Sequence, residues 1–148
     1  MEPTIDHIQV TVRDMAEALP FYDALMPLLG FDPARRTEAT LESADLHVVE
    51  YIHPNLCFCI GSPRTSVASD APHRRRPGAL HHLAFRATSR AEIDALYPEL
   101  IEIGATIVAA PREYPEYNPP TYYAVFFKDP TGIKYEVVHY TTSTEHTG

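Results

Sequence analysis

The chain has 148 residues, 45% of them hydrophobic and 22% charged, which is enough for one soluble globular domain with a sizeable core. Twelve lysines and arginines against twenty aspartates and glutamates give a net charge of −8, which argues against nucleic-acid binding. No apolar run approaches the roughly 18–20 residues that cross a bilayer, and the first residues do not resemble a secretory signal. We therefore expect a cytoplasmic protein with no nucleic-acid or membrane partner.

The first half of the chain predicts one strand, one helix and three further strands. Apolar and polar side chains alternate in residues 5–12, which is the pattern of a half-buried strand. A helical face follows and ends at Gly30, and prolines inside it predict a late start or a kink. The three further strands are expected at 31–36, 46–52 and 56–60.

Residues 61–79 are predicted to form a linker, because prolines and polar residues are frequent there. Its run Arg74–Arg76 is typical of a solvated loop. A second loop, at 111–121, is either a binding lid or a solvated connection.

The second half repeats the first at a constant offset that carries His7 to His82. A strand at 80–87 precedes a helix that begins with Ser89 and Glu92 in the spacing of a capping box. Three strands are then expected, at 106–110, 122–128 and 133–140. We therefore predict an α+β fold in which a single domain, 1–148, contains two tandem βαβββ modules, at 5–60 and 80–140, and a C-terminal tail at 141–148.

Two histidines, His7 and His82, hold equivalent strand positions in the two repeats, opposite the apolar face. Imidazole is the commonest protein metal ligand, and Glu136 in the last predicted strand would add a carboxylate. Such a set holds a divalent metal on one face and leaves positions open for substrate or oxygen. The alternative for Glu136 is a salt bridge to a lysine or arginine. Cys57 and Cys59, near the first-module counterpart of Glu136, are either a thiolate ligand or small buried residues.

Four further residues are candidates for contact with substrate. Gln9 shares the strand face of His7, and Arg86 shares that of His82. Tyr122 or Tyr123 could donate a hydrogen bond or act as an acid, and at least one of them is expected in the core.

Four segments resemble the vicinal oxygen chelate superfamily, which comprises glyoxalase I, bleomycin-resistance proteins, extradiol dioxygenases and fosfomycin-resistance thiol transferases. They are Asp6–Val10, Phe21–Leu25, His82–Phe85 and Asp129–Glu136. The resemblance implies a curled mixed sheet around a metal and substrate cavity, with His7, His82 and Glu136 as ligands. Many glyoxalases have a fourth ligand in the last strand of the first module, where this chain has cysteines and no carboxylate.

The resemblance also implies the function. The first hypothesis is an enzyme that uses a divalent metal (Fe, Mn, Ni or Zn) on a small oxygen-bearing metabolite, as a lyase, an isomerase or a dioxygenase. The alternative is a metal-free drug-binding protein of the bleomycin-resistance type, whose acidic surface would attract a cationic drug. A regulatory module with relic ligands is a third possibility. Such modules pair within a chain or across a dimer, and we expect a homodimer.

Overall fold

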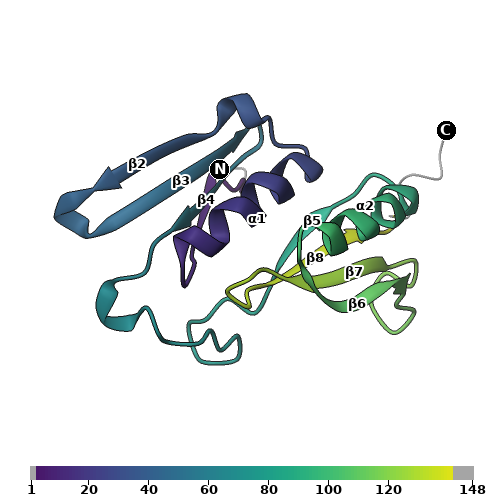
Figure 1. The fold of residues 1–148 in the computed structure, drawn as a ribbon. Coiled ribbons are helices and arrows are strands. Elements are labelled where there is room, and N and C mark those ends of the chain that lie inside the picture. Colours follow the sequence, from purple (N-terminus) through teal and green to yellow (C-terminus); the bar gives the residue numbers. More distant parts are fainter. Residues whose placement is uncertain (1–2, 142–148) are drawn as a thin grey trace. The chain divides into compact units, whose positions relative to one another are not determined.

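The computed structural model describes residues 3–141, and the chain divides into a first unit that ends at Ala71 and a second that begins at Pro72 (Figure 1). Each unit contains a strand, a helix and three further strands, and each sheet has four strands. This order confirms the predicted α+β fold of two βαβββ modules. The single domain over 1–148 stays a prediction, and all of the expected tail after Thr141 lies outside the described residues. No helix in the described part is long and apolar enough to cross a membrane.

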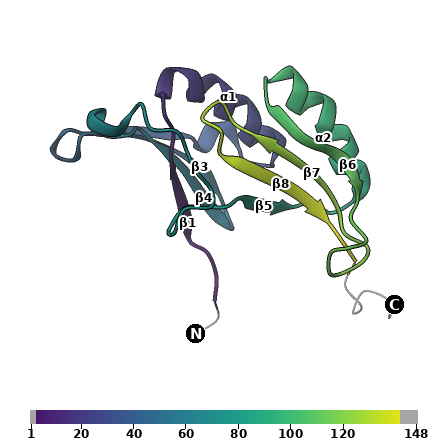
Figure 2. The same ribbon diagram turned by 90° about the horizontal axis from the view of Figure 1, so that it is seen from below.

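In the first unit one face of a mixed sheet is covered by the helix (Figure 2). The strand order is β1–β4–β3–β2, and β1 runs parallel to β4 while the other pairs are antiparallel. Phe58 on β4 stacks on Tyr22 of the helix, and both side chains are fully buried. The elements are β1 (His7–Thr11), α1 (Met15–Leu28), β2 (Thr37–Leu41), β3 (Leu46–His53) and β4 (Leu56–Gly61).

The second unit repeats this arrangement with the order β5–β8–β7–β6, again with the first strand parallel to the last. Tyr135 of β8 stacks with Phe85 and Phe127 from the two neighbouring strands. Its elements are β5 (Leu83–Arg86), α2 (Arg90–Glu102), β6 (Thr106–Glu113), β7 (Tyr123–Lys128) and β8 (Lys134–His139).

The predicted strand at 31–36 is wrong. The chain forms a 3-10 turn at Pro33–Arg35 there, and β2 begins at Thr37. Asp32 caps the turn by accepting a hydrogen bond from the backbone N–H of Ala34 at 2.9 Å, and the proline ring fixes the backbone at the first turn position. All five residues of β2 are exposed, so no alternation of apolar side chains marks the strand.

The late starts expected at the prolines do not occur, because α1 runs through Pro20 and Pro27 and α2 through Pro98. The other expectation, a kink at these prolines, stays a prediction. An interior proline costs about 3 kcal/mol. Burial of one helix face offsets this cost, since tertiary packing supplies most helical stability in proteins. Pro111 likewise lies within β6, where the edge position tolerates a missing N–H.

We predict that Ser89→Ala lowers the free energy of unfolding by about 1 kcal/mol. Its Oγ accepts a hydrogen bond from the backbone N–H of Glu92 at 3.2 Å, and the Glu92 carboxylate accepts one from the backbone N–H of Thr88 at 2.8 Å. Urea denaturation followed by circular dichroism measures the change. Ser69→Ala, in an exposed loop, is the control and should leave the midpoint unchanged; equal losses in both variants would contradict the assignment of the cap.

Candidate metal centre

A buried carboxylate lies on the face of the second sheet that is turned away from α2. Glu136 of β8 pairs with Ala84 of β5 and Phe126 of β7, and its side chain is 2% exposed. A buried charge is costly unless other groups compensate it. Its Oε2 lies 3.2 Å from Nε2 of His82, and the hydroxyl of Tyr122 donates to its Oε1. The basic side chain that lies at 3.2 Å from the Glu136 carboxylate is therefore a histidine, which forms an ion pair when its ring is protonated. The lysine or arginine of the alternative interpretation is present only as an electrostatic neighbour, Lys134.

His82 stands immediately before β5, and its side chain is 35% exposed. Its Nδ1 lies 2.7 Å from Nδ1 of His81, so one of these two rings donates and the other accepts. Burial, and then the neighbouring His82, hold the pKa of His81 below its usual value. The Nε2 of His82 and the carboxylate of Glu136 converge from two adjacent strands. An imidazole and a carboxylate that meet in this way, one of them open to solvent, fit a divalent metal ion.

Aromatic side chains flank this pair on the same face. Tyr122 stacks on Tyr140 with ring centroids 5.7 Å apart, and meets Tyr117 edge to face at 5.4 Å. Burial, and then the bond to Glu136, raise the pKa of Tyr122 above its usual value. Arg86 lies over the ring of Tyr140 at 3.7 Å and donates to its backbone carbonyl at 2.7 Å. Four tyrosines on this face are named the tyrosine wall: Tyr114, Tyr117, Tyr122 and Tyr140.

Tyr123 lies on the other face of the sheet. Its hydroxyl donates to Oδ1 of Asp94 on α2 at 2.6 Å, and Arg90 lies 5.1 Å from its ring. The structure therefore brings Tyr122 to Glu136 and does not bring Tyr123 there. Tyr140 was not predicted as a site residue. It lies four residues after Glu136, and side chains separated by an even number of residues along a strand share one face.

In the first unit, His7 and Gln9 lie on the sheet face turned away from α1. The Nδ1 of His7 is 2.6 Å from Oδ1 of Asp6, and its side chain is 63% exposed. Because a carboxylate only accepts, the proton of the neutral ring lies on Nδ1, and Nε2 is the nitrogen that can bind a metal. Gln9 pairs in register with Cys59 of β4.

The two cysteines share that face of the first sheet. The Sγ atoms of Cys57 and Cys59 lie 3.6 Å apart, and Glu50 of β3 pairs directly with Cys59. Burial, and then the neighbouring Cys57, raise the pKa of Cys59 to about 12. Cys59 occupies the place in this sheet that Glu136 occupies in the second, since each pairs with the same position of the first strand of its module. Glu50 was missed by sequence reasoning, because only the strand register connects it to the cysteines.

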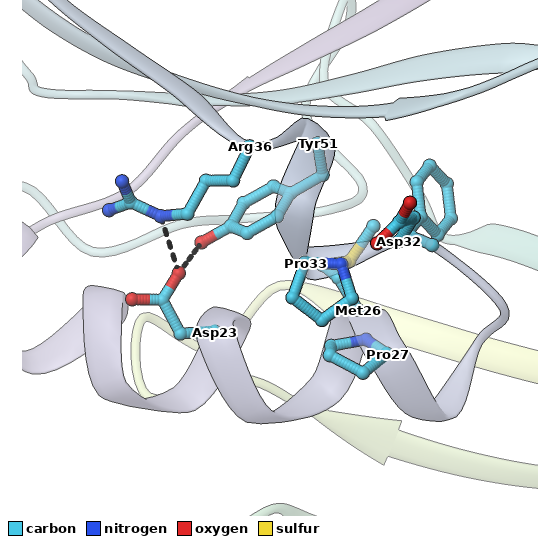
Figure 3. Close-up of a pocket in the computed structure, with 8 residues that line it drawn as sticks. Asp23, Met26, Pro27, Asp32, Pro33, Arg36 and Tyr51 are labelled. Atoms are coloured by element: carbon cyan, nitrogen blue, oxygen red, sulfur yellow. Dashed lines mark hydrogen bonds and ion pairs between the residues drawn. The ribbon is translucent and has the colours of Figure 1, made fainter.

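A pocket of the first unit lies on the opposite face, between α1, the Pro33–Arg35 turn and β3 (Figure 3). Asp23 accepts hydrogen bonds from Nε of Arg36 and from the hydroxyl of Tyr51, each at 2.8 Å. Arg36 also contacts Glu38 at 2.8 Å. Two carboxylates thus compensate the guanidinium, so the cluster anchors the turn before β2 and is a poor site for an anionic ligand.

A model of the Glyoxalase/Bleomycin resistance protein/Dioxygenase superfamily matches residues 4–137. The chain belongs to this superfamily. It is 26% identical over 132 residues to the uncharacterized protein YqjT of Bacillus subtilis, and this alignment covers 89% of this chain and 95% of YqjT. The crystal structure of a candidate glyoxalase from Bacillus halodurans is similar, with a TM-score of 0.68 and 30% sequence identity. The superposition covers 90% of this chain and 93% of that one.

A glyoxylase/bleomycin resistance protein/dioxygenase domain from Frankia sp. EAN1pec shares the fold with a TM-score of 0.77 at 20% identity, over 99% of this chain and 98% of that one. The resemblance to the vicinal oxygen chelate superfamily is therefore confirmed. The same fold occurs in proteins described as glyoxalases and as bleomycin resistance proteins or dioxygenases. The superfamily includes enzymes and binding proteins, so membership alone does not assign one activity.

We predict that Tyr122→Phe lowers the free energy of unfolding of the metal-free protein by about 1.5–3 kcal/mol, because a buried carboxylate loses a hydrogen bond. The matched control is Tyr123→Phe, which removes a hydroxyl that bonds the exposed Asp94 and should cost less than about 0.5 kcal/mol. Urea denaturation of both variants in the presence of a chelator measures the difference. Equal effects would contradict the role of Tyr122 as the donor that holds Glu136.

Proposed function

We propose that the protein is a divalent-metal-dependent enzyme of the glyoxalase and dioxygenase type that acts on a small oxygen-bearing metabolite. One observation carries this proposal: Nε2 of His82 and the buried carboxylate of Glu136 meet at 3.2 Å beside a cluster of apolar and aromatic side chains. A protein that only binds an organic ligand does not need such a pair. A metal enzyme needs such a pair, because a buried carboxylate compensates the positive charge of the ion and the two ligands together fix its coordination geometry.

The proposed ligands are His82, Glu136 and His7. The first two converge within the second unit, and His7 is assigned by its equivalence to His82 in the repeat. Asp6 supports this assignment, because a carboxylate on Nδ1 fixes the tautomer that offers Nε2 to a metal. Iron, manganese, nickel and zinc all accept two imidazoles and one carboxylate.

When bound, the metal supplies a Lewis acid that binds substrate oxygens and stabilises the negative charge that develops on them. Tyr122 keeps its proton at neutral pH, so its hydroxyl orients Oε1 of Glu136 and offers a hydrogen-bond donor beside the site. Arg86 is fixed against Tyr140, and its remaining N–H groups can bind a substrate oxygen. Gln9 is the proposed polar contact from the first unit. We further propose a homodimer that works in the cytoplasm.

We predict that the wild type retains about one Mn(II) or Fe(II) ion per chain after anaerobic loading and desalting. His82→Ala, Glu136→Gln and His7→Ala should each retain much less, because each removes one of three ligands. His73→Ala, at an exposed loop position, is the matched control and should retain the wild-type amount. Inductively coupled plasma mass spectrometry measures the content. Full retention by His82→Ala and Glu136→Gln would overturn the proposed site.

The reaction class follows from three assays on the loaded protein. These are isomerisation of a hemithioacetal, oxygen consumption with catechols, and addition of a thiol to an epoxide. Activity in one of them, lost in Glu136→Gln, would establish the enzyme, and inactivity in all three would remove the named reaction classes.

The second candidate function is metal-free binding of a cationic aromatic drug. The tyrosine wall favours it, since the rings of Tyr117 and Tyr122 meet edge to face at 5.4 Å, and aromatic faces attract organic cations. Isothermal titration with such a drug in the presence and absence of a chelator separates the two functions. Binding that is unaffected by the chelator, together with failure to retain metal, would favour sequestration.

A further inference from the structure

A second group of metal-binding side chains gathers in the first unit, on the sheet face turned away from α1. The register aligns Gln9, Cys59 and Glu50 across three adjacent strands. Cys57 lies two residues before Cys59, so both side chains leave β4 on the same side. Phe58 and Ile60 alternate with the cysteines along β4, and both are fully buried. Because Phe58 packs on α1, the cysteines lie on the opposite face of the sheet.

The spacing of this group matches a chelate. The two Sγ atoms are 3.6 Å apart, and a carboxylate oxygen of Glu50 and both sulfurs all lie within 4.8 Å of one another. With metal–sulfur bonds of about 2.3 Å, two thiolates on a tetrahedral ion lie about 3.8 Å apart. The sulfurs therefore stand almost at chelating distance, and only small side-chain rotations are needed to bring the carboxylate in.

The surroundings also suit a cation. The partner that the structure gives the Glu50 carboxylate is a neutral hydroxyl, since Thr37 donates to Oε2 at 2.7 Å. This bond orients the carboxylate, as groups behind a metal ligand do. Cys59 is buried, whereas Cys57 and Glu50 are half-buried, so an ion can enter from solvent. One carboxylate and two thiols that lose their protons on metal binding thus face one another.

We propose that Glu50, Cys57 and Cys59 form a second metal site that takes a thiophilic divalent ion such as Zn²⁺ or Cd²⁺. Binding forms two metal–sulfur bonds and one metal–oxygen bond, and each cysteine S–H releases its proton to solvent. Water completes the coordination. Thiolates select softer ions than a histidine and carboxylate set does, so this site and the His82–Glu136 site differ in the ions they prefer.

Titration with Co(II) under reducing, anaerobic conditions tests this site, after a thiol assay has shown that both cysteines are free. We expect a sulfur-to-cobalt charge-transfer band that saturates at about one ion per chain and disappears on addition of Zn(II). The chain has two cysteines, so Cys57→Ser/Cys59→Ser must lose the band entirely. Glu50→Gln should bind at least about tenfold more weakly, since even the partners of a ligand contribute that much.

The controls separate this site from the proposed enzyme centre. His82→Ala/Glu136→Gln should keep the full charge-transfer band, so the thiolate site can be tested even where the enzyme proposal fails. Glu42→Gln changes an exposed carboxylate of the same unit and should bind Co(II) as the wild type does. Circular dichroism confirms that each variant is folded. Absence of the band in a wild type with two free thiols would overturn the site, and unchanged affinity in Glu50→Gln would remove Glu50 from it.

Discussion

The burial of one carboxylate in the middle of a sheet constrains the strands around it in the second unit. Glu136 is 2% exposed, and a charge in that position needs groups around it that compensate it. The neighbouring elements supply these groups: His82 comes from the residue before β5, and Tyr122 from the residue before β7. The position of both strands relative to β8 thus determines whether the carboxylate is stable, and the same contacts define the candidate metal centre.

The two units share a topology but place different chemistry at equivalent positions. In the second sheet the central acid is Glu136, and its neighbour on the next strand is the apolar Phe126. In the first sheet the central position holds Cys59, and the acid has moved one strand along to Glu50. The repeat thus keeps its fold while it exchanges the side chains at equivalent positions: a carboxylate beside an imidazole in the second unit, and two thiols beside a carboxylate in the first.

The sequence predicts the modules well, because each carries a helix face and strands whose apolar side chains recur at the period of the secondary structure. It fails where packing and register decide. The exposed strand β2 has no apolar alternation to reveal it, and the interior prolines are tolerated only because the helices bury a face. Alternation alone separates Tyr122 from Tyr123, but which of them faces Glu136 depends on the pairing of β7 with β8. Glu50 could not be predicted as a neighbour of the cysteines either, because only the pairing of β3 with β4 brings it to Cys59.

The central proposal is that His82 and Glu136 hold one divalent ion. Its most direct test is an anomalous difference map from crystals of the wild-type protein grown with Mn(II). We expect one strong peak within bonding distance of Nε2 of His82 and of the Glu136 carboxylate. A peak bound to neither His82 nor Glu136, or the absence of any peak beside the 3.2 Å pair that they form, would contradict it.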